Sequence, residues 1–136
     1  MRPSRVSQED AQGCGLAVLA MITGRTYAEV KAEVESWEHD PMQGPKDWSQ
    51  TGVTHYTLDR FLAGQGYFVQ RRFDGWPELP KEPFAPIHYA SVQQPSNRGH
   101  FVVVLENGDV LDPLREGTFR LADWEKVNQL VGCVKR

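Results

Sequence analysis

The longest apolar stretch of the chain lies near its N-terminus and predicts a buried helix. Residues 14–23 read CGLAVLAMIT, which places apolar side chains on every face of a helix. Such a helix belongs in the interior of a protein, and Gly24 is placed to end it in a left-handed conformation. The apolar run itself, Leu16 to Ile22, is far shorter than the roughly 20 residues that span a bilayer.

Two further helices are expected in the first half of the chain. Thr26 and Glu29 have the spacing of a capping box. Apolar residues then recur at helical spacing, at Tyr27, Val30, Val34 and Trp37. Residues 39–52 are rich in proline and glycine and predict a loop. A short helix is expected over 56–63, with an inward face formed by Leu58, Phe61 and Leu62.

The second half of the chain reads as strands. The segments with strand character are 67–73, 86–92, 100–105, 109–113 and 131–136. Residues 75–86 hold four prolines and must be irregular. Residues 106–108, Glu-Asn-Gly, join two strands as a hairpin. Helices followed by strands indicate an α+β fold, in which the buried helix packs against an antiparallel sheet.

Length, charge and cysteine content narrow the class of protein. A chain of 136 residues suits one domain, 1–136. Its net charge of −3 gives no reason to expect binding to nucleic acid or to an anionic membrane. Acidic residues lead into the apolar run, so we expect no signal peptide. Two cysteines do not make a disulfide framework, and we expect free thiols and a cytoplasmic location.

Cys14 is a candidate nucleophile because it opens the buried helix. A helix N-terminus favours negative charge, and the thiolate is the reactive form of cysteine. The glycines on either side, Gly13 and Gly15, are expected to leave room for a substrate backbone. From position alone, a buried structural cysteine is an equally good interpretation.

A cysteine nucleophile needs a base and a group that orients the base. His100 opens the most apolar strand, and Asp112 lies on the other arm of the hairpin. A two-residue turn at 107–108 would place Asp112 opposite Val103, on the face away from His100. A three-residue turn at 106–108, with Gly108 at positive φ, would place Asp112 opposite Val102 and diagonal to His100. We expect the three-residue turn, because Glu-Asn-Gly suits it.

The oxyanion of an acyl-transfer intermediate needs hydrogen-bond donors. The backbone amide of Cys14, at the start of the helix, can provide one. The side-chain amide of Gln8 or of Gln12 could provide the other. Gln8 is the better candidate, since six positions of chain allow it to loop back over the thiol.

Two segments carry a family resemblance. Residues 8–30 read QEDAQGCGLAVLAMITGRTYAEV, and residues 100–113 read HFVVVLENGDVLDP. Together they resemble the bacteriocin-processing cysteine peptidases that cleave double-glycine leaders, as a stand-alone member. The resemblance implies a papain-like fold with Cys14 as nucleophile, His100 as base, Asp112 as third member and Gln8 as oxyanion donor. The family often has Asp before the cysteine, where this chain has Gly13.

These residues predict a cysteine peptidase that hydrolyses a peptide or isopeptide bond through a thioester. A peptide or protein substrate is the expected partner, no cofactor is needed, and the His and Cys spacings match no metal site. Two alternatives stay open: another papain-like activity (amidase, deconjugase or acyltransferase) and a peptide-binding domain without catalysis. A disulfide or redox pair between Cys14 and Cys133 is disfavoured, because the sequence lacks C-x-x-C.

Overall fold

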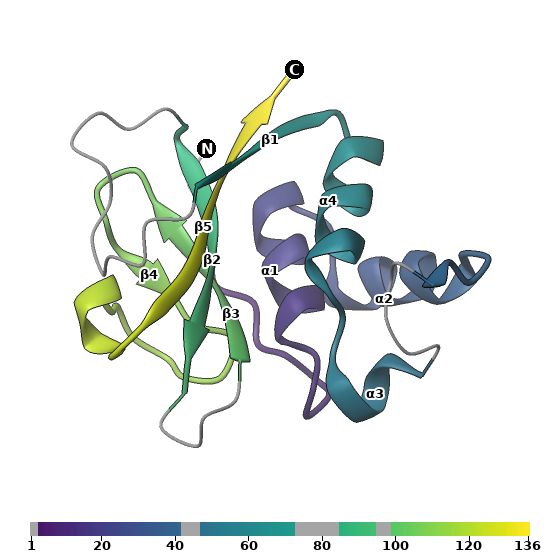
Figure 1. Ribbon diagram of the computed structural model, residues 1–136, viewed down its shortest axis with the longest axis horizontal. Helices are drawn as coiled ribbons and strands as arrows, with labels where there is room; N and C mark the ends of the chain where they lie inside the picture. Colours follow the sequence, from purple (N-terminus) through teal and green to yellow (C-terminus); the bar gives the residue numbers. More distant parts are fainter. Residues whose placement is uncertain (1–2, 42–46, 73–84, 95–98) are drawn as a thin grey trace.

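The computed structural model describes residues 3–41, 47–72, 85–94 and 99–136. Its α-helices come first and its strands afterwards (Figure 1). The elements in chain order are α1 (Cys14–Thr23), α2 (Tyr27–Ser36), α3 (Trp48–Thr51), α4 (His55–Gly64), β1 (Tyr67–Arg72), β2 (Ile87–Gln93), β3 (Gly99–Leu105), β4 (Val110–Leu111), the 3-10 helix η2 (Leu121–Asp123) and β5 (Val127–Lys135).

The ends of the first two helices follow local sequence signals. α1 covers the expected residues and is closed by Gly24, whose φ of 75° is left-handed. α2 begins with the expected capping box, in which the Thr26 side chain accepts from the Glu29 amide and the Glu29 carboxylate accepts from the Thr26 amide. Both predictions are confirmed.

Other elements differ from the sequence-based expectation. Residues 48–51 were expected in a loop but form the short α3, because the Asp47 side chain accepts a hydrogen bond from the Ser49 amide and caps one turn. β5 begins at Val127 rather than at residue 131, since it pairs with both β1 and β2. The proline-rich segment 75–86, expected to be irregular, lies outside the described residues up to position 84.

The five strands form one antiparallel sheet with the order β1-β5-β2-β3-β4. The C-terminal strand therefore lies inside the sheet, between β1 and β2. The described helices α1, α2, α3 and α4 all lie on one side of this sheet in Figure 1. The expected α+β architecture, a buried helix against an antiparallel sheet, is confirmed.

The main core lies between α1 and the sheet. Residues 15–22 of α1 are all buried, because the helix packs against β3 on one side and against α2 and α4 on the others. Tyr89, Val103 and Val131 meet it from three strands. The opposite face of the sheet has its own apolar cluster, which includes Val102, Val104 and Trp124. The sheet is therefore covered on both faces, and α1 is packed directly against one of them.

Candidate active site

The hairpin between β3 and β4 sets the geometry of the site. Val103 pairs with Leu111, and Val104 pairs with Val110. The turn is closed by a hydrogen bond from the Gly108 amide to the Leu105 carbonyl, and Gly108 has a φ of 92°. This is the three-residue turn that the sequence predicts. By strand alternation, Asp112 therefore lies on the same face of the hairpin as His100.

His100 and Asp112 form a buried pair. The Nε2 atom of His100 donates to Oδ1 of Asp112 at 2.7 Å, and the two side chains are 4% and 0% exposed. The carboxylate cannot donate, so the proton must lie on Nε2. The other ring nitrogen, Nδ1, is left for a second partner. The geometric prediction for this pair is confirmed.

Cys14 is the second partner of His100. It opens α1, is half-buried and is not in a disulfide. Burial lowers the pKa of the His100 imidazole, but hydrogen bonds with Asp112 and Cys14, and the negative charge of both, raise it to about 9. A raised pKa favours the imidazolium over the neutral ring. The arrangement therefore sets a readily protonated imidazole beside the Cys14 sulfur at the N-terminus of a helix.

Asp112 is held by more than His100. Its Oδ1 also accepts from the Leu114 amide at 2.8 Å, and its Oδ2 accepts from Arg115 Nε at 3.1 Å. Burial raises the pKa of this carboxyl, but the hydrogen bonds from His100, Leu114 and Arg115 outweigh burial and hold it below its usual value. Asp112 is thus kept ionised inside the protein. No signal in the sequence marks Leu114 or Arg115 as a partner of Asp112.

The N-terminal segment also holds the loop that follows β4. Arg5 Nε donates to the carbonyl oxygens of Asp112 at 2.8 Å and Arg115 at 2.9 Å, and a second Arg5 nitrogen donates to the Pro113 carbonyl at 3.2 Å. The backbone amide of Gln8 donates to the same Pro113 carbonyl. Residues 5–8 therefore connect the Asp112 loop to the segment that leads into Cys14. No local motif in the sequence points to this contact, because more than 100 positions separate Arg5 from Asp112.

The side chain of Gln8 is turned toward its own loop. Its Nε2 donates to the carbonyl oxygens of Asp10 and Ala11, both at 3.0 Å. Its Oε1 is buried and has no hydrogen-bond partner among the described residues. An amide nitrogen has two hydrogens, so Gln8 must release one of these carbonyls to donate to an oxyanion. Its role as oxyanion donor stays a prediction.

The glycines beside Cys14 have a different role from the one expected. A side chain at Gly13 would overlap the Tyr27 hydroxyl, and one at Gly15 would overlap Val53. The expectation that these glycines leave room for a substrate backbone is therefore wrong, because the chain's own side chains fill that space. Close packing fixes the start of α1 instead. The segment before Cys14 is also anchored to α2, because the Tyr27 hydroxyl donates a hydrogen bond to the Asp10 carboxylate at 2.7 Å.

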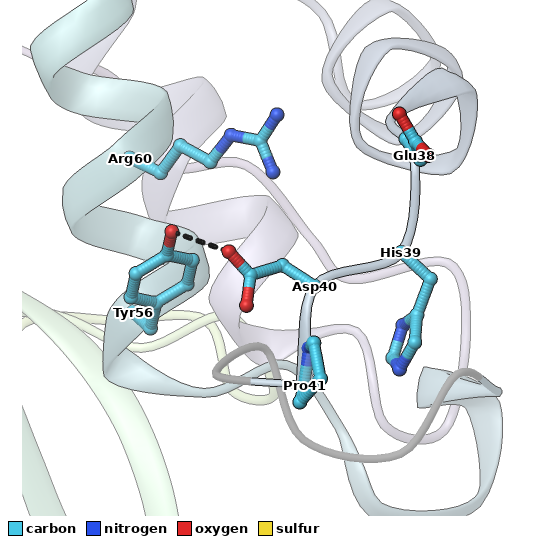
Figure 2. Close-up of a pocket in the computed structure, with 6 residues that line it drawn as sticks. All are labelled: Glu38, His39, Asp40, Pro41, Tyr56 and Arg60. Atoms are coloured by element: carbon cyan, nitrogen blue, oxygen red, sulfur yellow. Dashed lines mark hydrogen bonds between the residues drawn. The ribbon is translucent and has the colours of Figure 1, made fainter.

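The other histidines have different surroundings. His55 begins α4, and its Nδ1 lies 3.3 Å from the Tyr89 hydroxyl, which itself donates to Asp59. His88 is buried on β2. His39 lies in a pocket of about 500 Å³ near α4, where the Tyr56 hydroxyl donates to Asp40 at 2.9 Å (Figure 2). None of the predicted catalytic residues lines this pocket.

Within 3–41, 47–72, 85–94 and 99–136, no group of three or more His, Cys, Asp or Glu side chains could hold a metal ion. No helix in those ranges is long and apolar enough to cross a membrane.

The fold has known relatives, although no protein-family model and no curated protein matches the sequence. The peptidase domain of Streptococcus ComA, a bi-functional ABC transporter involved in quorum sensing, superposes with a TM-score of 0.68 at 15% identity, over all of both chains. The peptidase domain of Streptococcus mutans ComA gives 0.62 at 14%, over 96% of this chain and 98% of the other. The chain has the fold of these peptidase domains.

A third relative of this peptidase fold was solved with a peptide bound. It is a double-glycine-motif protease from an AMS/PCAT transporter in complex with the leader peptide, with a TM-score of 0.62 and 17% identity. The match covers 98% of this chain and 92% of the relative. The resemblance proposed from the Gln, Cys-Gly, His and Asp-Pro segments is thus confirmed at the level of the fold, from one end of the chain to the other.

Proposed function

We propose that the protein is a cysteine peptidase in which Cys14 is the nucleophile, His100 the general base and acid, and Asp112 the group that orients His100. The observation that carries the proposal is the position of His100 between the Cys14 thiol and the buried Asp112 carboxylate. The peptidase fold supports it. Three groups with three complementary roles in one place make the arrangement that nucleophilic catalysis requires.

The proposed reaction has two halves. In the first, the Cys14 thiolate attacks the substrate carbonyl and forms a C–S bond, while the carbonyl oxygen becomes an oxyanion. His100 gives its proton to the leaving amine as the C–N bond breaks, which leaves a thioester. In the second, His100 takes a proton from water, the hydroxide adds to the thioester, and the C–S bond breaks to release the acid and the thiolate.

Two donors are proposed for the oxyanion. The Cys14 amide lies in the first turn of α1, where backbone N–H groups have no acceptor within the helix. Gln8 is the second donor once its side chain releases the Asp10 or Ala11 carbonyl. Asp112 does not react. It keeps the proton on His100 Nε2 and leaves Nδ1 facing the thiol.

A peptide is the proposed substrate. The leader-peptide complex of the double-glycine-motif protease supports this choice, because that relative shares the fold over nearly all of this chain. The buried carboxylate and the raised pKa of His100 favour a catalytic protein over one that only binds peptides, since binding alone needs no imidazolium.

The test is hydrolysis of a peptide library that includes sequences with a Gly-Gly step. We expect turnover by the wild type, none by Cys14→Ala, and unchanged turnover by Cys133→Ala. Cys133 is a matched control because it is the other free cysteine, is buried in β5, and has its thiol pKa raised by burial to about 12. Equal turnover by the wild type and Cys14→Ala, or transfer of the acyl group only to added amines, would contradict a peptidase with this nucleophile.

A further inference from the structure

Arg115 occupies the one oxygen of Asp112 that His100 does not use. Asp112 Oδ1 is shared by His100 Nε2 and the Leu114 amide, whereas Arg115 Nε donates to Oδ2 at 3.1 Å. The Asp112 side chain is 0% exposed, so the loss of Arg115 would remove this hydrogen bond from a buried carboxylate oxygen. A carboxylate held at both oxygens has a fixed plane, and the direction of Oδ1 toward the imidazole is then fixed too.

The Arg115 side chain is itself held in place although it is 53% exposed. Its guanidinium carbon lies 4.4 Å from the centre of the Phe119 ring and 5.6 Å from that of Trp124. Stacking on aromatic rings restricts an arginine that would otherwise move freely in solvent. Arg5 also donates to the Arg115 carbonyl, so both the backbone and the side chain of this residue are tied to the site.

We propose that Arg115 is a positioning residue that holds the second oxygen of Asp112 and thereby keeps Asp112 ionised and aimed at His100. This inference rests on the proposed function, because it concerns the residues to which that function assigns catalysis. Arg115 touches neither Cys14 nor a substrate in this scheme. It acts only through Asp112.

The charged groups around Asp112 decide the sign of the effect. His100 faces it from β3, Cys14 faces His100 from α1, Arg115 comes from the same loop, and Arg5 reaches its backbone from the N-terminal segment. Arg115 is one of the partners that lower the Asp112 pKa. Its removal should therefore raise that pKa, so that Asp112 becomes protonated, and stops supporting the imidazolium, at a higher pH.

The experiment follows the titration of the His100 ring by NMR, which needs no substrate. The wild type should titrate near pH 9. In Arg115→Gln the pKa of His100 should fall by roughly half a unit to one unit, because a carboxylate that is free to turn away supports the imidazolium less; the change is modest because Arg115 is half exposed. Arg115→Lys, which keeps the charge, should lower the pKa of His100 less.

Arg25→Gln is the matched control. Arg25 also pairs with a carboxylate, Glu33, at 3.1 Å, and is 30% exposed, but it has no described hydrogen bond with Asp112 or with the β3–β4 turn. It should leave the pKa of His100 unchanged. A His100 pKa that is unchanged in Arg115→Gln, even with a lowered melting temperature, would show a structural role alone and overturn the inference. A wild-type His100 that titrates near the ordinary value of 6.5 would instead overturn the proposed function, and the inference with it.

Discussion

At the scale of single residues, His100 is the group that interacts with both of the other proposed catalytic side chains, Cys14 and Asp112. Its ring is buried, which on its own disfavours a positive charge. The Asp112 carboxylate and the Cys14 thiol reverse that preference and raise the pKa of His100 to about 9, against 6.5 for an ordinary histidine. The stability that comes from the raised pKa of His100 is fully present below pH 6.5 and is lost as the pH rises through about 9. The lowered pKa of Asp112 contributes stability with the opposite pH dependence, which is lost as the pH falls and the carboxylate is protonated.

This charge balance predicts the titration of His100. In the wild type, NMR should follow the His100 ring titrating near pH 9. In Asp112→Asn the pKa of His100 should fall, because burial still lowers it while the hydrogen bond to an anion is gone. A His100→Asn sample identifies the signal among the four histidines. The same His100 pKa in Asp112→Asn and wild type would show that the carboxylate does not support the ring.

Gln8 provides the second prediction at this scale. Gln8→Ala should lower kcat by about 10², the cost expected when one oxyanion donor is removed. Gln12→Ala should change kcat little, which makes Gln12 the matched control in the same loop. The measurement is steady-state hydrolysis together with thermal unfolding. If Gln12→Ala lowers kcat and Gln8→Ala does not, the oxyanion donor is Gln12 and not Gln8.

At the scale of elements, the start of α1 depends on its fit against α2. A Cβ atom at Gly13 would meet the Tyr27 hydroxyl, which donates a hydrogen bond to Asp10. Gly13→Ala should destabilise the protein by roughly 1–3 kcal/mol, as overpacking does. In Gly13→Ala/Tyr27→Phe the added methyl no longer meets the hydroxyl, so the double variant should be more stable than the sum of the two single effects. Strict additivity in urea unfolding would show that the two residues are not in contact.

The hairpin between β3 and β4 is the other element on which the site depends. Gly108 has a φ of 92°, which a residue with a side chain adopts at a cost. Gly108→Ala should lower the free energy of unfolding by about 1–2 kcal/mol and reduce kcat through the displaced Asp112. Gly64→Ala is the control, since a side chain there meets nothing within 4 Å and Gly64 is not among the glycines with positive φ. Equal stability of the two variants would contradict a turn in which Gly108 has a positive φ.

At the scale of the whole molecule, the sequence predicts the features that depend on residues close to one another along the chain. α1, the capping box of α2 and the turn at Gly108 each follow from a few adjacent positions. That is why the pairing of His100 with Asp112 could be predicted from the alternation of side chains along one hairpin.

Contacts between distant segments could not be predicted in this way. β5 lies between β1 and β2 and extends back to Val127, through Asn128 and Gln129, which carry no strand signal. Two hydrogen bonds to Asp112 also depend on tertiary packing: the one from Arg5 to its carbonyl oxygen and the one from Arg115 to its Oδ2 atom. The filled space beside Gly13 and Gly15 likewise comes from Tyr27 and Val53, which the sequence does not place there.

In the proposed mechanism, His100 on β3 activates Cys14 on α1 as a nucleophile across the junction of the helices and the sheet. The most direct measurement is alkylation by iodoacetamide at about pH 6, where an ordinary cysteine thiol is almost fully protonated. Intact-mass analysis should find one rapid adduct on Cys14 in the wild type, and a rate at least about tenfold lower in His100→Asn. Equal rates in the two proteins, or a wild-type rate that rises only above about pH 8 as for a free thiol, would show that His100 does not activate Cys14.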